Sequence, residues 1–122
     1  MAKEQKILIA EDDPFLMKVM GNILSDEGFE IELAEDGAEA IAKIGKDGYA
    51  VVLLDLIMPK KTGFEVLEEA KKKGVKTPIL VFSNLSQPED KKEALELGAK
   101  DYFVKSDMSI DEVAAAVKKY AK

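Results

Sequence analysis

Acidic, hydroxyl and ammonium side chains follow four short apolar runs of this sequence. Glu11 and Asp12 follow the first run and Asp55 the third, while Ser83 and Lys105 follow the fourth and the fifth. Two carboxylates about 4 Å apart repel each other by roughly 4 kcal/mol at an effective dielectric constant of about 20, so three acids together require a cation. Mg²⁺ or Mn²⁺ suits oxygen ligands, and a hydroxyl and an ammonium suit phosphoryl oxygens. These residues predict a metal and phosphate site if the fold brings them together.

Five β-branched runs alternate with longer stretches of helical periodicity, which predicts repeated βα units and a parallel sheet. The predicted strands are residues 6–10, 29–34, 50–54, 78–82 and 101–104. All but the second are nearly continuous in apolar character, as strands covered on both faces are. Right-handed crossovers then favour a doubly wound, flavodoxin-like (βα)5 fold of the α/β class with strand order 2-1-3-4-5. In such a sheet, ligands bind at the carboxyl ends of the strands.

Helix-start and helix-end signals separate these runs. Residues typical of N-caps precede the helical stretches: Asp13, Asp36, Thr62, Ser86 and Ser109. The last three have a glutamate three residues later and predict capping boxes. Glycines stand where four helices are expected to end: Gly28, Gly45, Gly74 and Gly98. Each glycine is expected to adopt the left-handed conformation that terminates a helix.

The first predicted helix has one clear apolar stripe, which we expect to pack on the sheet. The stripe consists of Leu16, Val19, Met20, Ile23 and Leu24. Phe15 and Met17 lie off this stripe, so both are expected to be exposed beside the acidic residues. Exposed apolar side chains next to a reactive pocket suggest a docking surface for a partner protein.

Composition excludes several classes of function. The 122 residues, 47% of them hydrophobic, predict a single domain over residues 1–122 without an effector domain. Cysteine and histidine are absent, which excludes disulfides, thiol nucleophiles, catalytic triads and zinc sites. All 18 basic residues are lysine and the net charge is -6, so nucleic acid is not an expected ligand. No apolar run reaches the ~18 to 20 residues of a membrane helix, and a cytoplasmic monomer or weak dimer is expected.

Three segments resemble the signature blocks of bacterial response-regulator receiver domains of the single-domain, chemotaxis type. They are residues 7–13 (ILIAEDD), residues 53–59 (LLDLIMP) with Gly63, and residues 98–105 (GAKDYFVK). The resemblance implies a phosphoacceptor of two-component signal transduction that switches a partner-binding surface. By this resemblance, the protein is not an enzyme that acts on another substrate; it assists its own phosphorylation and dephosphorylation. The implied partners are a histidine kinase or phosphotransfer protein and an unknown downstream protein.

The resemblance also implies a role for each acidic residue. Asp55 would be the phosphoacceptor, and Glu11, Asp12 and Asp55 would hold Mg²⁺ or Mn²⁺ together with the backbone carbonyl of Ile57. The chemistry agrees with this assignment, because a carboxylate can attack phosphorus once its charge is neutralised.

Ser83 and Lys105 would contact the phosphoryl group by the same resemblance. Ser83 and Tyr102 would form the switch, because a phosphoryl oxygen draws the Ser83 hydroxyl inward and vacates space for the Tyr102 ring. Ser106 follows Lys105 where receivers commonly carry proline, so the Lys105–Ser106 peptide bond is expected to be trans.

Ile57 and Leu85 would flank the path of the water that hydrolyses the phosphoryl group. Ile57 lies two residues after Asp55, and Leu85 lies two residues after Ser83. Two branched apolar side chains cannot orient a water by hydrogen bonding, so a long-lived aspartyl phosphate is expected.

Three alternatives are weighed against the receiver. A flavodoxin-like flavin carrier requires a hydroxyl-rich and glycine-rich loop after the first strand, whereas this chain has Glu11, Asp12 and Asp13 there. An aspartyl phosphatase requires a second aspartate two residues after the nucleophile, and that position is Ile57. An engineered or degenerate scaffold with an idle site would explain the regular helix caps and the all-lysine basic set.

Overall fold

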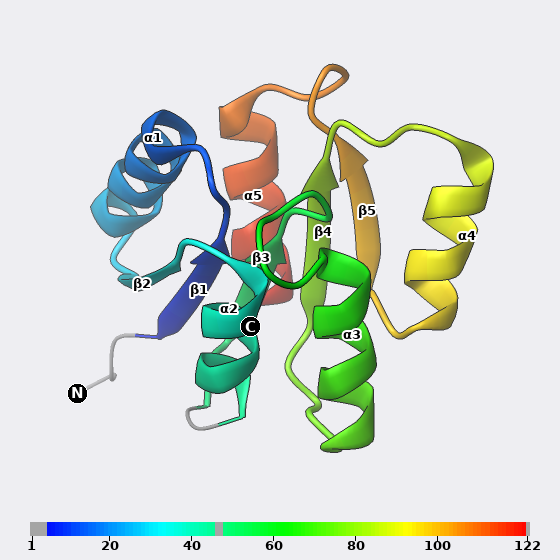
Figure 1. Cartoon of the computed structure of the whole chain (residues 1–122). Helices are drawn as coiled ribbons and strands as arrows, with labels where there is room; N and C mark the ends of the chain where they lie inside the picture. Colours follow the sequence, from blue (N-terminus) through cyan, green and yellow to red (C-terminus); the bar gives the residue numbers. More distant parts are fainter. Residues whose placement is uncertain (1–4, 46–47, 122) are drawn as a thin grey trace.

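The apolar runs form a five-stranded parallel sheet in the computed structural model (Figure 1), which describes residues 5–45 and 48–121. The strands are β1 (Lys6–Ala10), β2 (Glu30–Ala34), β3 (Val51–Leu54), β4 (Ile79–Ser83) and β5 (Asp101–Val104). Their order across the sheet is β2-β1-β3-β4-β5, and every neighbouring pair is parallel. The predicted topology is therefore confirmed. Strands β2, β3 and β4 each begin one residue later than the sequence predicts.

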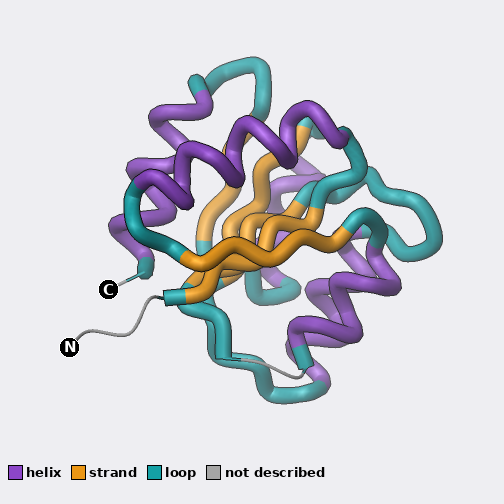
Figure 2. The backbone as a smooth tube through the Cα atoms, turned by 90° about the vertical axis from the view of Figure 1, so that its left-hand side faces the viewer, coloured by secondary structure: helices purple, strands orange, loops and turns teal. Residues whose placement is uncertain are grey.

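The helices cover both faces of this sheet (Figure 2). They are α1 (Pro14–Asp26), α2 (Gly37–Ile44), α3 (Gly63–Lys72), α4 (Pro88–Glu96) and α5 (Ile110–Tyr120). Helices α1 and α5 pack on one face, and α2, α3 and α4 pack on the other. Every residue of β3 and β4 is buried, whereas the edge strand β2 is only partly covered. The nearly continuous apolar character of the central strands follows from this double cover.

The register of the sheet aligns the carboxyl ends of its central strands. Ala10 of β1 pairs with Leu54 of β3, so Glu11 and Asp55 follow paired residues. Ser83 of β4 pairs with Val104 of β5, so Lys105 follows the partner of Ser83. The residues singled out from the sequence consequently leave the sheet at the same edge.

Most helix starts agree with the predicted caps. The Asp13 side chain accepts hydrogen bonds from two backbone N–H groups of α1, and Asp36 accepts one from α2. Thr62 and Ser109 each form a complete capping box. The box predicted at Ser86 is wrong, because the N-cap of α4 is Gln87 and makes no side-chain cap hydrogen bond. Pro88 occupies the first helical position, for which its fixed φ is suited, and thereby sets the start of α4.

Three of the four glycines at helix ends have the predicted left-handed conformation. The φ angles are 99° at Gly28, 71° at Gly74 and 107° at Gly98. Gly45 differs, because its φ is -76° and it continues the right-handed conformation of α2. In residues 5–45 and 48–121, no helix has both the length and the apolar character needed to cross a membrane.

Candidate functional site

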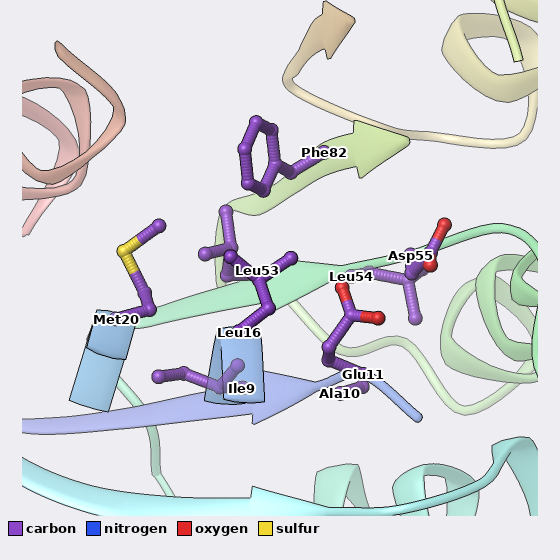
Figure 3. A pocket seen from close by; sticks show the side chains of 9 residues that line it. All are labelled: Ile9, Ala10, Glu11, Leu16, Met20, Leu53, Leu54, Asp55 and Phe82. Carbon is purple, nitrogen blue, oxygen red and sulfur yellow. The ribbon is translucent and has the colours of Figure 1, made fainter. Parts of the chain in front are cut away.

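Glu11 and Asp55 stand at the carboxyl ends of two neighbouring central strands. The backbone N–H of Glu11 donates to Ala34 O at 3.0 Å, and that of Asp55 donates to Ala10 O at 3.0 Å. Only 4% of Glu11 and 6% of Asp55 is exposed. Figure 3 shows both carboxyl groups at the same end of a pocket lined mostly by apolar side chains. The sheet therefore holds two carboxylates together in a largely apolar environment.

The ammonium of Lys105 compensates both carboxylates. Its Nζ lies 2.8 Å from Glu11 Oε1 and 3.0 Å from Asp55 Oδ2. The backbone N–H of Lys105 donates to Ser83 O at 2.8 Å, which fixes the base of the side chain at the end of β5. The Lys105–Ser106 peptide bond is trans, as predicted. An isolated buried charge is strongly unfavourable, so this shared ammonium stabilises both acids.

Burial and the shared ammonium also change how the groups ionise. Burial raises the pKa of Glu11 from 4.5 to about 7; the hydrogen bond from Lys105 opposes this shift, and the charge of Asp55 adds to it. Burial by itself lowers the pKa of Lys105, but the hydrogen bonds to Glu11 and Asp55 raise it above its ordinary value. Lys105 therefore stays charged at neutral pH, whereas Glu11 titrates near neutrality.

Asp12 completes a group of three acids. One oxygen from each of Glu11, Asp12 and Asp55 lies within 4.8 Å of the other two, and Asp12 is the exposed member. The backbone N–H of Ile57 donates to Asp55 Oδ1 at 3.3 Å, so the loop after β3 lies against the same carboxylate. A compact set of carboxylate oxygens fits a hard divalent cation such as Mg²⁺.

Ser83 and Tyr102 hold the same residue of the loop between β4 and α4. Ser83 is fully buried, and its Oγ accepts a hydrogen bond from the backbone N–H of Leu85 at 3.3 Å. The Tyr102 hydroxyl donates to Leu85 O at 2.6 Å. Only 7% of Tyr102 is exposed, so its ring is already buried in this structure. The two predicted switch residues are therefore connected through Leu85.

Ile57 and Leu85, the residues expected beside the water path, differ in exposure. Ile57 is 54% exposed next to Asp55, to which its backbone is hydrogen-bonded. Leu85 is half-buried and packs against the core between the sheet and α2, α3 and α4. Ile57 is thus the more accessible of the two.

The family model of the response regulator receiver domain matches residues 7–118. The chain belongs to this family. Membership confirms the family resemblance and, with it, the predicted role as a receiver domain of two-component systems. It favours this function over the flavin-carrier alternative.

Relatives of this receiver domain include transcriptional regulators. The chain is 34% identical to the Transcriptional regulatory protein DltR of Streptococcus agalactiae, over 93% of the chain and 50% of the relative. It is also 34% identical to the Transcriptional regulatory protein TrcR of Mycobacterium tuberculosis, over 93% of the chain and 44% of the relative. The chain spans about half the length of these curated relatives.

Solved receiver domains have the same fold. The receiver domain of the Francisella response regulator 1452 superposes with a TM-score of 0.90 and 31% identity, covering 97% of both chains. A CheY-like receiver domain protein from Methanospirillum hungatei gives a TM-score of 0.90 and 27% identity, covering 98% of this chain and 94% of its own.

Phe15 and Met17 of the receiver domain have different environments. Phe15 is 74% exposed, in agreement with the sequence-based expectation. The expected exposure of Met17 is wrong, because only 5% of it is exposed and it packs in the core beneath α1 and α5. Helix α1 buries Met17, Met20 and Leu24, which are three and four residues apart and share one face. A docking surface at the start of α1 therefore rests on Phe15 alone.

Asp36 and Gly37 contact the loop that follows Asp55, which the sequence analysis missed. The backbone N–H of Gly37 donates to Pro59 O at 3.2 Å, and Lys60 Nζ lies 3.4 Å from Asp36 Oδ2. The sequence marks Asp36 only as a helix start. The sequence did contain a signal, namely the glycine directly after the N-cap. Glycine is unfavourable within a helix, so its presence there suggests a close contact that leaves no room for a Cβ.

Proposed function

We propose that Asp55 of this receiver domain accepts a phosphoryl group from a histidine kinase or a phosphotransfer protein. Glu11, Asp12 and Asp55, with the backbone carbonyl of Ile57, hold Mg²⁺ or Mn²⁺ during the transfer. The observation that best supports this proposal is the environment of Asp55. Its carboxylate is buried, accepts a hydrogen bond from Lys105 at 3.0 Å and lies within 4.8 Å of two other acids.

The Asp55 carboxylate acts as the nucleophile. A carboxylate oxygen bonds to phosphorus while the bond from phosphorus to the donor's imidazole nitrogen breaks, and the product is an acyl phosphate. Mg²⁺, when bound, supplies positive charge that offsets the carboxylates and the phosphoryl oxygens. Lys105 supplies a second positive charge beside Asp55. Because Ser83 Oγ already accepts from Leu85, its hydrogen remains available to a phosphoryl oxygen.

Intact mass spectrometry after incubation with acetyl phosphate tests the proposal. The chain contains no histidine, so the phosphoryl group must come from the added donor. We expect a mass increase of one phosphoryl group in the presence of Mg²⁺ and none in the presence of a chelator. Equal uptake in the chelator, or no uptake with Mg²⁺ and donor, contradicts the proposal.

The affinity for Mg²⁺ should rise with pH as Glu11 ionises. Burial raises the pKa of Glu11 to about 7, so its carboxylate becomes protonated as the pH falls through that value. A protonated Glu11 no longer binds the metal ion. Affinity at about pH 8 should exceed affinity at about pH 6 by about tenfold. Isothermal titration calorimetry at both pH values measures the difference. Glu11→Gln should bind Mg²⁺ weakly, with the same affinity at both pH values. If the parent's affinity for Mg²⁺ is the same at both pH values, Glu11 is not the titrating metal ligand.

Ile57→Asn should shorten the lifetime of the aspartyl phosphate. The Ile57 side chain is 54% exposed beside Asp55, where an amide can orient an attacking water by hydrogen bonding. We expect the phosphoryl group to be lost about tenfold faster, which corresponds to about 1.4 kcal/mol of activation free energy. Leu85→Glu should increase the rate of phosphoryl loss by a smaller factor, because Leu85 packs against the core. Leu95→Asn, at a 41% exposed position on α4, is the control. Equal or slower loss from Ile57→Asn contradicts the argument.

Phosphorylation of Asp55 should change the environment of Tyr102. A phosphoryl oxygen that engages the Ser83 hydroxyl displaces Leu85, whose carbonyl is the acceptor of the Tyr102 hydroxyl. NMR of the tyrosine rings measures this effect, with Tyr49 as the internal reference. In Ser83→Ala the shift of the Tyr102 signals should be smaller. Tyr102 signals that move no more than those of Tyr49 would refute the coupling.

A further inference from the structure

The loop between β3 and α3, residues 55–62, is fastened to the start of α2. Figure 1 shows this loop beside the segment that joins β2 to α2. The backbone N–H of Gly37 donates to Pro59 O at 3.2 Å. A Cβ on Gly37 would overlap the backbone carbonyl of Lys61 and would lie 2.6 Å from Lys61 Cβ. The two backbones therefore approach as closely as they do only because residue 37 has no side chain.

Within this loop, Lys60 has a conformation that needs support from its surroundings. Its φ is 70°, the only positive φ of a non-glycine residue in the described part of the chain. Such a conformation is unfavourable for an L residue and persists when neighbouring contacts impose it. The ion pair of Lys60 with Asp36 and the hydrogen bond from Gly37 to Pro59 are two such contacts.

The other end of the loop is equally enclosed. The backbone N–H of Gly63 donates to Leu56 O at 2.9 Å, and a Cβ on Gly63 would overlap the carbonyl of Asp55. Leu56 and Met58 are buried, with 1% and 7% of their surfaces exposed. Because these contacts hold the loop at Gly63, we expect a displacement of Lys61 to pass along the loop toward Ile57.

Ile57 connects the loop to the acidic site. Its backbone N–H donates to Asp55 Oδ1 at 3.3 Å, and its carbonyl is the proposed main-chain ligand of the metal. A shift of Ile57 therefore changes both the orientation of the Asp55 carboxylate and the position of a ligand.

We propose that Gly37 is a positioning residue for the metal site: the absence of a side chain at Gly37 lets α2 hold the loop at Pro59 and Lys61 in the shape that places Ile57 against Asp55. The inference rests on the proposed function of Asp55 and extends it to a residue of α2 that does not belong to the acidic site. A residue that does not bind the metal but orients one of its ligands typically contributes about 10- to 100-fold to metal affinity.

The test compares Gly37→Ala with Gly48→Ala, the same substitution at a site where a Cβ meets nothing within 4 Å. In metal-free protein, the backbone amide signals of residues 56–58, 60 and 61 should shift in Gly37→Ala, as followed by NMR. Calorimetric titration should show Mg²⁺ binding weakened by about tenfold. In Gly48→Ala, both the amide signals and the affinity should equal those of the parent.

Two further variants separate positioning from general destabilisation. Val117→Ala removes packing from a fully buried position of α5, on the opposite face of the sheet, and should lower stability without changing Mg²⁺ affinity. Asp36→Asn keeps a residue that caps α2 but removes the ion pair with Lys60, and should change the affinity less than Gly37→Ala does. If Gly37→Ala does not fold, the double variant Gly37→Ala with Lys61→Gly is compared with Lys61→Gly alone. Glycine at position 61 removes the clash with Lys61 Cβ and lets the loop move away from the clash with the backbone.

The outcomes distinguish this inference from the proposed function. A Gly37→Ala protein that binds Mg²⁺ as tightly as the parent overturns the inference and leaves the proposed function intact. A parent that neither binds Mg²⁺ nor takes up phosphoryl overturns the proposed function, while displaced amide signals in residues 56–58, 60 and 61 of Gly37→Ala still support the positioning role. Unchanged amide signals in Gly37→Ala overturn the positioning role in either case.

Discussion

Asp55→Asn should abolish phosphoryl uptake from acetyl phosphate in the presence of Mg²⁺. Asparagine has nearly the shape of aspartate, but its amide oxygen carries no charge and is a weak nucleophile. It also loses the ion pair with Lys105, whose Nζ lies 3.0 Å from Asp55 Oδ2, and keeps at most a hydrogen bond to a neutral acceptor. We expect the rate to fall by at least about 10³-fold, which corresponds to ~4 kcal/mol of activation free energy. Intact mass spectrometry over time measures the uptake.

Two neighbouring aspartates provide controls for this prediction. Asp13 is exposed and caps α1, and asparagine caps a helix equally well, so Asp13→Asn should take up phosphoryl at the parent's rate. Asp12→Asn should slow the uptake by weakening metal binding, and higher Mg²⁺ concentrations should restore part of the rate. Uptake by Asp55→Asn at the parent's rate would place the nucleophile at another residue.

The topology was predictable because several independent signals agree. Apolar runs of four to five residues, N-cap residues before the helices and glycines after them all indicate the same βα units. The strand starts that shifted by one residue lie at Phe29, Ala50 and Pro78, which are apolar but sit in the connections, and β4 also ends one residue later than predicted, at Ser83. Pro78 has no N–H to donate, and its carbonyl accepts the hydrogen bond from Val52 that starts the pairing of β3 with β4.

The orientation of α1 was not predictable from its periodicity. Two overlapping stripes both contain Met20 and Leu24; one continues through Leu16 and Ile23, and the other through Met17. They differ by a small rotation of the helix about its axis, which packing against β2 and α5 decides. The structure buries Met17, with 5% of it exposed, and leaves Leu16 half-buried.

The grouping of the site residues was predictable, but the contacts that support them were not. The topology alone places Glu11, Asp55 and Lys105 at one edge, because each follows a strand of the parallel sheet. The sharing of one ammonium by both carboxylates depends on side-chain conformations that no spacing encodes. The close approach of Gly37 to the loop after β3 joins segments separated by about 20 residues, and only the three-dimensional packing reveals it.

Lys105→Met should destabilise the metal-free domain by about 3 kcal/mol at about pH 8. Methionine keeps most of the apolar stem, but it leaves Glu11 and Asp55 without the ammonium that now lies 2.8 Å and 3.0 Å away. Both carboxylates are nearly inaccessible to water, so solvent cannot replace the lost partner. Urea unfolding in the presence of a chelator measures the change in the free energy of unfolding.

The loss should be smaller at lower pH. Burial already raises the pKa of Glu11 to about 7, and the Lys105 hydrogen bond, which opposes this shift, is absent from the variant. Between the ordinary value of 4.5 and the raised value in the folded protein, the native state binds a proton that the unfolded state has released. The free energy of unfolding must therefore decrease as the pH rises through this window. Lys105→Met should consequently be more stable at about pH 6 than at about pH 8.

The double variant Glu11→Gln with Lys105→Met separates charge compensation from packing of the lysine stem. The ammonium also lies over the Phe82 ring, with Nζ 5.8 Å from the ring centroid, and both variants lose this contact. The double variant keeps only one buried carboxylate. If charge compensation dominates, it should regain most of the stability that Lys105→Met loses, and its stability should depend less on pH. If stem packing dominates, the double variant should be as unstable as Lys105→Met at both pH values. Mg²⁺ adds a second criterion, because a cation held by the acids can take over the role of the ammonium in Lys105→Met, and it can do so less well once Glu11 is an amide.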